Sequence, residues 1–212
     1  MQEQPVETTL YSLAAAAPAP ASGRDGEPLL TLYRVGSLII AGRRELCLIK
    51  NISCGGMMIR AYCEMACNTP VSVELKSGEA IEGTVSWVRD SSVGITFDTP
   101  IDVIDLLSSS MEGPRPRMPR IEVDCIATVR DGARVVRLRV RDVSQGGLKL
   151  ENRAILACDT EVVVSLPGLE PQPGVVRWNE DGFTGITFNQ LWPLPILVGW
   201  LKQQRSVMRV AG

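Results

Sequence analysis

The stretch Asn51-Ile-Ser-Cys-Gly-Gly-Met57 returns as Asp142-Val-Ser-Gln-Gly-Gly-Leu148, 91 residues later in the chain. Two further matches keep the same offset: Val85-Ser-Trp87 returns as Val176-Arg-Trp178, and Gly94-Ile-Thr-Phe97 returns as Gly185-Ile-Thr-Phe188. Three matches in one register indicate a duplication, because chance does not easily produce them. A repeat of this length is too long for a solenoid unit and long enough to be a domain. The sequence therefore predicts two copies of one domain.

The overall composition is that of a globular protein without a strong charge. The chain has 212 residues, of which 45% are hydrophobic and 22% charged, and its formal net charge is −2. This length fits two domains of about 80–90 residues and a tail. A net charge so close to zero does not indicate affinity for nucleic acid or for a membrane surface. We therefore expect no DNA or RNA partner.

The amino-terminal residues 1–28 are rich in Ala, Pro, Gly and acidic residues, and this composition predicts a disordered tail. The tail lacks the basic start of a secretory signal, and Pro18 ends its apolar run Ala14–Ala17. No run in the sequence approaches the length that spans a bilayer. We therefore expect a cytoplasmic protein with no membrane span.

Six cysteines and the absence of histidine limit the chemistry that the chain can perform. The cysteines follow no shared framework in the two copies, so we expect reduced, partly buried thiols. Cys63 and Cys67 do not have the usual Cys-x2-Cys spacing of a zinc site, and we expect no metal and no cofactor. The lack of histidine removes the commonest general base, and no nucleophile constellation stands out. The sequence does not predict an enzyme.

Short strands separated by Gly, Asn, Asp and Pro turns make up each copy. The strands expected in the first copy are 32–41, 44–51, 57–61, 70–75, 80–89 and 93–97, and those in the second are 121–129, 134–143, 147–152, 160–166, 173–180 and 183–188. Arg130-Asp-Gly-Ala133 and Ser77-Gly78 supply turns. The pattern predicts an all-β fold, either a barrel or a sandwich. We favour two tandem six-stranded antiparallel β-barrels, because closed barrels leave no exposed edges.

A helix is predicted after the last strand of each copy. The first is Ile101–Ser108, with Ile101, Ile104 and Leu107 at helical spacing, and the second is about Pro195–Arg205, with Ile196, Leu197, Trp200 and Leu201 on one face. We expect each helix to pack against its own barrel, and a role of the second in self-association stays open. Trp87 and Trp178 are expected to be core or barrel-closing residues, and neither is assigned to a ligand.

The expected division of the chain follows from these elements. It consists of a tail at 1–28, a first domain at 29–108, an Arg- and Pro-rich linker at 109–120 and a second domain at 121–206. The prolines of the linker argue against regular structure there.

The pattern Asp/Asn-x-Ser-x-x-Gly, together with the arginine-rich segment before the second copy and the Val-x-Trp and Gly-x-x-Phe that follow, resembles the PilZ domain family. Members of that family are six-stranded β-barrels, many of which bind the bacterial second messenger cyclic di-GMP. The resemblance covers both copies, from about residue 30 to about residue 205. It implies that the chain is built from two PilZ-like domains.

Carried over residue by residue, the resemblance implies a ligand-binding role for Asp142, Ser144 and Gly147 in the second copy. Asn51, Ser53 and Gly56 hold the same places in the first copy. A carboxylate can accept hydrogen bonds from a guanine edge, and a hydroxyl can bond ligand or backbone. The glycine allows close backbone approach or a positive φ. Because the pattern occurs in both copies, part of it must be structural, and a plain turn remains the alternative.

The second signature of the family is an Arg-x-x-x-Arg segment before the first strand, and the resemblance assigns it to Arg115, Arg117 and Arg120. The spacing departs from the family pattern, because Pro116 occupies the required position. Arg120 directly precedes the expected strand, and its partner is either Arg117 or Arg115. An arginine can bond guanine O6 and N7 or pair with phosphate. A solvated basic linker is the alternative. The first copy has only Arg34 in this region and is interpreted as degenerate for ligand binding.

Three arginines, Arg137, Arg139 and Arg141, alternate along one expected strand and so share a face. The first copy has Leu46, Leu48 and Lys50 in their places. Between Gly113 and Arg141 there are eight arginines against three acidic residues, which suits an anionic ligand. The alternative is a solvent face balanced by nearby acids. The leucines of the first copy suggest that its face is buried against the second domain.

These observations lead to one functional hypothesis and one alternative. The chain is expected to be a receptor that binds cyclic di-GMP through its second domain, and ligand binding would order the linker and change the domain arrangement. The output would be an altered surface for a protein partner that the sequence does not identify. The alternative is an adaptor that binds its partner without nucleotide.

Overall fold

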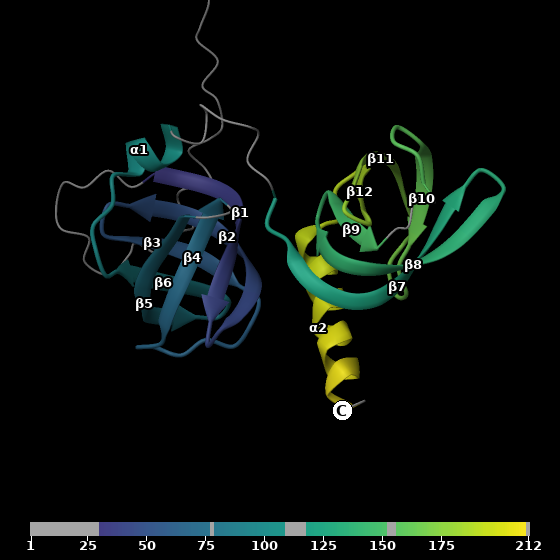
Figure 1. The fold of residues 1–212 in the computed structure, drawn as a ribbon. Helices are drawn as coiled ribbons and strands as arrows, with labels where there is room; N and C mark the ends of the chain where they lie inside the picture. Colours follow the sequence, from purple (N-terminus) through teal and green to yellow (C-terminus); the bar gives the residue numbers. More distant parts are fainter. Residues whose placement is uncertain (1–29, 77–78, 109–117, 152–155, 211–212) are drawn as a thin grey trace, which may run out of the picture.

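The computed structural model describes residues 30–76, 79–108, 118–151 and 156–210, and this part of the chain forms two closed antiparallel barrels of six strands each (Figure 1). The first barrel has the strand order β1-β2-β3-β6-β5-β4, and the second repeats it as β7-β8-β9-β12-β11-β10. The prediction of two tandem six-stranded barrels is confirmed. The predicted tail at 1–28 lies outside the described residues.

The strands of the first barrel are β1 (Leu30–Ile40), β2 (Arg43–Ser53), β3 (Gly56–Ala61), β4 (Pro70–Lys76), β5 (Glu79–Arg89) and β6 (Ser92–Phe97). Those of the second are β7 (Ile121–Asp131), β8 (Arg134–Ser144), β9 (Gly147–Glu151), β10 (Glu161–Ser165), β11 (Gln172–Glu180) and β12 (Phe183–Phe188). Each barrel closes through three residue pairs, between β1 and β4 and between β7 and β10. The predicted turn after Arg130 is present, and Gly132 adopts the positive φ of 56° that it requires. Ser77-Gly78 lies outside the described residues.

A tryptophan covers a glycine on the neighbouring strand in both barrels. Trp87 pairs with Gly94, and Trp178 pairs with Gly185. A Cβ atom on Gly185 would lie 2.1 Å from the indole Nε1 of Trp178, so only glycine leaves room for the ring. This contact explains why the Val-x-Trp and Gly-Ile-Thr-Phe segments return together.

Of the two places expected for these tryptophans, the core or the closure of the barrel, the structure excludes the core. Trp87 and Trp178 are half-buried, and neither belongs to the cluster of buried side chains in its barrel. The tryptophans of the second core are Trp192 and Trp200 instead. Repetition in both copies therefore marked a ring that packs on a strand rather than one inside the barrel.

Helix α1 (Val103–Ser108) follows the first barrel and is capped by Asp102, whose Oδ1 accepts hydrogen bonds from the backbone N–H groups of Ile104 and Asp105. The predicted apolar stripe is wrong at Ile104, which is 78% exposed. Val103 and Leu106 pack against the barrel instead, together with Ile101. The side chain of Leu107, the third residue of the predicted stripe, is not among those that the structure describes.

Helix α2 (Leu194–Val210) is longer than predicted and packs against its own barrel, as expected. Leu197, Trp200 and Leu201 are buried there, but Ile196 is exposed, so its predicted place on the buried face is wrong. Leu194 and Val198 complete that face. Among the described residues, no helix is long and apolar enough to cross a membrane.

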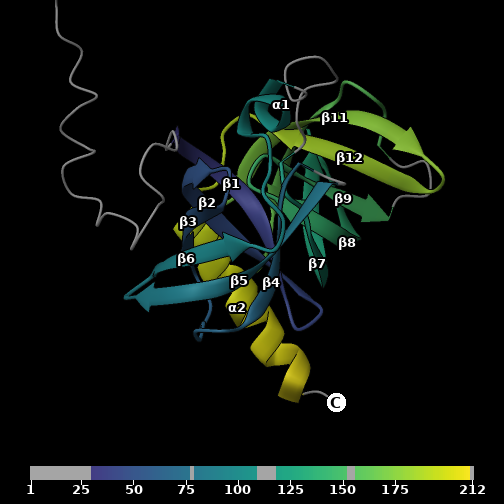
Figure 2. The same cartoon turned by 90° about the vertical axis from the view of Figure 1, so that its left-hand side faces the viewer.

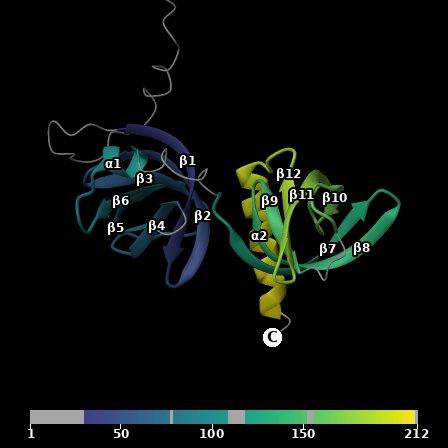
Figure 3. The ribbon, with the colours of Figure 1, turned by 45° about the horizontal axis from the view of Figure 1, so that its top comes forward.

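The first barrel contacts the second through one face of β1 and β2. Leu46 is buried within the core cluster of the second barrel, and Val35 and Leu48 pack against that cluster. The hypothesis that the leucines of the first copy face the second domain is confirmed. Helix α2 lies on the side of the second barrel that faces the first, as Figures 1 and 3 show and as the side view of Figure 2 agrees.

The Trp178–Gly185 contact can be tested with Gly185→Ala, which we expect to destabilise the chain by about 1–3 kcal/mol because the added methyl group overlaps the indole. Gly199→Ala in α2 is the matched control, since a Cβ there meets nothing within 4 Å. The control should stabilise the chain by up to about 1 kcal/mol, because alanine favours helix. Urea denaturation measures both, and equal effects of the two substitutions would contradict the contact.

Candidate functional site

A large cleft of about 1310 Å³ lies where the two barrels meet. Its walls come from both copies: Met118, Pro119, Arg120, Ile121, Glu122, Asp142, Lys149, Trp178 and Glu180 on the second barrel, Ser37, Gly42, Arg43, Arg44 and Glu74 on the first, and Arg205 on α2. The charged side chains of this lining are five basic and four acidic. The cleft therefore offers hydrogen-bond donors and acceptors on two opposed walls.

Arg120 and Asp142 meet in the wall of this cleft. Arg120 directly precedes β7, and Asp142 lies near the end of β8, the strand that pairs with β7. The Arg120 Nη1 donates to Asp142 Oδ1 at 2.7 Å, with side chains 38% and 19% exposed. The structure thus joins the two residues that the resemblance had placed on separate signatures. One face of the pair stays open to the cleft, where a planar guanidinium and a carboxylate can recognise a nucleobase edge or a phosphate.

Ser144 and Gly147 shape the hairpin that follows Asp142. The Ser144 hydroxyl is buried and donates to the Gly147 carbonyl at 3.2 Å, and Ser53 donates to the Gly56 carbonyl at 3.3 Å in the first copy. A Cβ on Gly147 would lie 2.2 Å from the backbone oxygen of Ile186, so the glycine is needed for close approach and not for a positive φ. Neither Ser144 nor Gly147 lines the cleft.

The remaining predicted residues, Arg115 and Arg117, lie outside the described residues. The described chain resumes at Met118, which lines the cleft beside Arg120. The choice between Arg115 and Arg117 as the partner of Arg120 therefore stays a prediction.

Several cleft residues were missed by the sequence analysis. Lys149 pairs with Asp142 in the β8–β9 register, and its Nζ lies 4.1 Å from the centre of the Phe183 ring. Trp178 was missed because its recurrence suggested the core or the closure of the barrel and not a ligand. Lys149 carried one usable signal, since it stands two residues after the signature glycine and points to the same side of the sheet as its register partner.

The wall on the first barrel is organised around Arg44. Its guanidinium donates to Ser37 Oγ at 3.1 Å and forms a two-pronged ion pair with Glu74. The hydrogen bond to Glu74 raises the pKa of Arg44 above its ordinary value, so this group stays charged. Arg205 of α2 donates to the backbone oxygen of Arg44 at 2.8 Å and also pairs with Glu45. Helix α2 therefore connects the two walls.

The corresponding place in the first copy is different. Asn51 stands where Asp142 stands, but its side chain is only 7% exposed. A buried amide cannot present itself to a ligand as Asp142 does. This difference supports the interpretation of the first copy as degenerate.

Comparison with known proteins identifies similarities of family and fold. The family model described as "PilZ domain" matches residues 27–110 and 114–191. No curated protein sequence matches the chain. The chain is similar to the crystal structure of the Borreliella burgdorferi PlzA protein in complex with c-di-GMP, with 12% identity, a TM-score of 0.37 and coverage of 82% of this chain and 92% of that one.

Two further solved structures show a similar level of likeness. The Bacillus subtilis inhibitor of motility, MotI/DgrA, is 13% identical with a TM-score of 0.31, covering 86% of this chain and 98% of that one. YcgR from Escherichia coli in complex with c-di-GMP is 14% identical with a TM-score of 0.30, covering 84% of each chain. Because these TM-scores are low, the arrangement of the two barrels is taken from the structure of this chain alone.

The Arg120–Asp142 pair can be measured by a double-mutant cycle. Arg120→Ala and Asp142→Ala should each destabilise the chain, and the double variant should lose less than both together, with a coupling of about 0.5–1 kcal/mol for this partly exposed pair. Urea denaturation followed by tryptophan fluorescence provides the free energies. The exposed pair Arg177–Asp159, whose charged atoms are 3.9 Å apart, is the matched control and should couple more weakly. Strict additivity at Arg120 and Asp142 would show that they do not interact.

Proposed function

The chain belongs to the PilZ domain family, and from this membership and the geometry of the cleft we propose that its second barrel binds cyclic di-GMP. The observation that carries the proposal is the meeting of Arg120 and Asp142 at 2.7 Å in the wall of the cleft. These residues come from the two signature elements of the family. We propose that the protein acts as a cytoplasmic receptor and not as an enzyme.

The proposed contacts follow from the chemistry of the ligand. The guanidinium of Arg120 can donate to guanine O6 and N7, while a carboxylate oxygen of Asp142 accepts from the N–H groups of a guanine edge. Arg115 and Arg117 are proposed to bind phosphate or the second guanine from the linker. Ser144 and Gly147 take the role of holding the hairpin that presents Asp142, since they do not line the cleft.

The size and charge of the cleft agree with such a ligand. Its volume of about 1310 Å³ exceeds the range of about 300–1,000 Å³ that is usual for pockets holding drug-sized molecules. A cyclic dinucleotide is large and carries two phosphates, so it needs basic groups on more than one side. Lys149 on the second barrel and Arg43 on the first stand on opposite walls.

The proposed signal is a change in how the two barrels are held together. The described contacts between them include an apolar contact made by Val35, Leu46, Leu48 and Tyr62, and the bonds of Arg205 to Glu45 and Arg44. A ligand that bonds to Arg120 and also to the first-barrel wall would alter these contacts. We propose that the rearranged surface is recognised by a protein partner.

The proposed site is tested by isothermal titration calorimetry with cyclic di-GMP. Arg120→Ala and Asp142→Ala should each weaken binding by about 10- to 100-fold, because each removes a charge-assisted hydrogen bond. Arg139→Ala is the matched control, since Arg139 lies on the same strand β8 but outside the cleft. The affinity of the Arg139→Ala variant for cyclic di-GMP should equal that of the unchanged chain. Absence of heat at high micromolar ligand, or unchanged affinity of both cleft variants, would overturn the proposal.

The alternative function is a nucleotide-independent interaction module. Two observations favour it: the Arg120 guanidinium is already paired with Asp142, and Pro116 breaks the family spacing. In that case the same titration shows no binding, and the affinity for a protein partner does not depend on cyclic di-GMP.

The proposed rearrangement is tested by small-angle X-ray scattering. Saturating cyclic di-GMP should change the scattering curve of the unchanged chain. Without ligand, Arg205→Ala should raise the radius of gyration, because it removes the bonds from α2 to the first barrel. Arg177→Ala, which removes an exposed arginine of β11 without touching the first-barrel wall, is the control and should leave the curve unchanged. Identical curves with and without bound ligand would exclude a change in domain arrangement.

A further inference from the structure

The outer surface of the second barrel carries a mixed apolar and basic face on β7, β8, β10 and β11. We call it the hairpin face and define it by six residues: Ile126, Arg130, Val135, Arg137, Val163 and Pro173. Val135, Arg130, Val163 and Pro173 are successive register partners across the four strands. Paired residues of antiparallel strands point to the same side, so these four side chains form one continuous row.

The same face of the first copy is already a contact surface. Ile126 pairs with Arg139 in the second barrel, and Val35 pairs with Leu48 at the equivalent place in the first. Val35, Leu46 and Leu48 pack against the second barrel. The fold therefore uses this face for protein contact in one of its two copies.

In the second copy the face is exposed. Ile126 is 41% exposed and Val135 is 58% exposed, although both are aliphatic. Arg139 on the same strand pairs with Asp124, whereas within the described part of the chain Arg130 and Arg137 form no ion pair. Arginine side chains without an acidic partner and uncovered aliphatic groups thus lie side by side.

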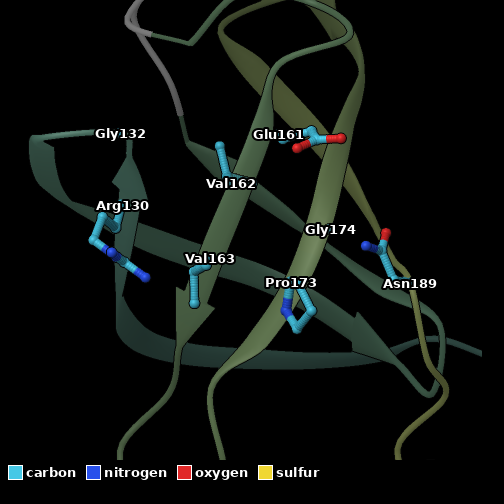
Figure 4. Close-up of a pocket in the computed structure, with 8 residues that line it drawn as sticks. All are labelled: Arg130, Gly132, Glu161, Val162, Val163, Pro173, Gly174 and Asn189. Atoms are coloured by element: carbon cyan, nitrogen blue, oxygen red, sulfur yellow. The ribbon is translucent and has the colours of Figure 1, made fainter.

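A pocket of about 220 Å³ adjoins the row, and Figure 4 shows Arg130, Val163 and Pro173 around it. Glu161 and Asn189 complete its polar lining. The pocket has room for about one side chain of a partner. A concave site next to an arginine and aliphatic groups is the kind of place that anchors a protein interface.

We propose that the hairpin face is a docking surface for an acidic segment of a protein partner. Carboxylates of the segment pair with Arg130 and Arg137, and its apolar side chains cover Val135 and Ile126. A nucleic acid fits less well, because no defining residue of the face is aromatic and could stack on a base. The face shares no residue with the cleft, so this docking does not rest on binding of cyclic di-GMP.

The proposal is tested by selecting a random peptide library, displayed on phage, against the full chain. The enriched peptides should contain Asp or Glu flanked by apolar residues. A labelled synthetic copy of the most enriched peptide is then titrated by fluorescence anisotropy. Arg130→Ala and Val135→Ala should weaken its binding at least about 10-fold, the effect expected of an interface anchor. Arg89→Ala, an exposed arginine of the first barrel, is the control and should change nothing.

Three results would overturn the proposal. No enrichment, or enriched peptides without acidic residues, would show a solvated face instead. Peptide binding that is the same in Arg130→Ala as in the unchanged chain would place the peptide elsewhere. A labelled single-stranded oligonucleotide is titrated in the same way. If its affinity exceeds that of the peptide and Arg130→Ala lowers that affinity, the face belongs to nucleic acid. Both face residues are exposed, and circular dichroism of the variants separates loss of binding from loss of fold.

Discussion

The close approach of the β8–β9 hairpin to strand β12 is the constraint on which the rest of the second domain depends. Only glycine at 147 leaves room for the backbone oxygen of Ile186. The hairpin carbonyls then hold the chain that leaves the barrel, since Gly146 accepts from the N–H of Phe188 and Gln145 from that of Trp192, both at 2.9 Å. The first copy repeats these bonds: the carbonyl of Gly55 accepts from the N–H of Phe97, and the carbonyl of Cys54 accepts from that of Ile101. The signature therefore first holds β9 close to β12 and fixes the segment that leaves the barrel.

That constraint also couples the cleft to the first barrel. Asp142 lies at the entrance of the hairpin, and Trp192, bonded to Gln145, leads directly into α2. Helix α2 is fixed to the second barrel by Leu197 and Trp200 and reaches the first barrel with Arg205. A shift of the hairpin on ligand binding would move the start of α2 and be transmitted to its far end. The path from the hairpin to the first barrel consists of packed and bonded elements.

The sequence predicted the architecture because duplication allows each copy to check the other. The register of Trp178 on Gly185 and the pairing of Arg120 with Asp142 were not predicted, because the sequence does not show which residues of adjacent strands stand opposite each other. The two errors in the helices have one physical origin. Helical periodicity shows which residues share one face of a helix, but not whether that face is the one that packs against the barrel. Ile104 and Ile196 fit helical spacing and are nevertheless exposed, because the direction of each helix is set by the barrel beneath it. Arg205 could not be found at all, since its partners are about 160 positions away in the chain.

In a duplicated domain, the face that one copy uses for contact also exists in the other copy, where no second barrel covers it. If both copies kept the apolar face of Val35, Leu46 and Leu48, the face of the second copy would stay uncovered and would invite open-ended association. Arginine at 137 and 139 removes that hazard by adding charge. Charge alone does not account for Ile126 and Val135, whose aliphatic surfaces remain in water on the same face. Their exposure beside Arg130 and Arg137, which form no ion pair within the described part of the chain, is better explained by a partner than by solubility, because solubility would favour polar residues in their places.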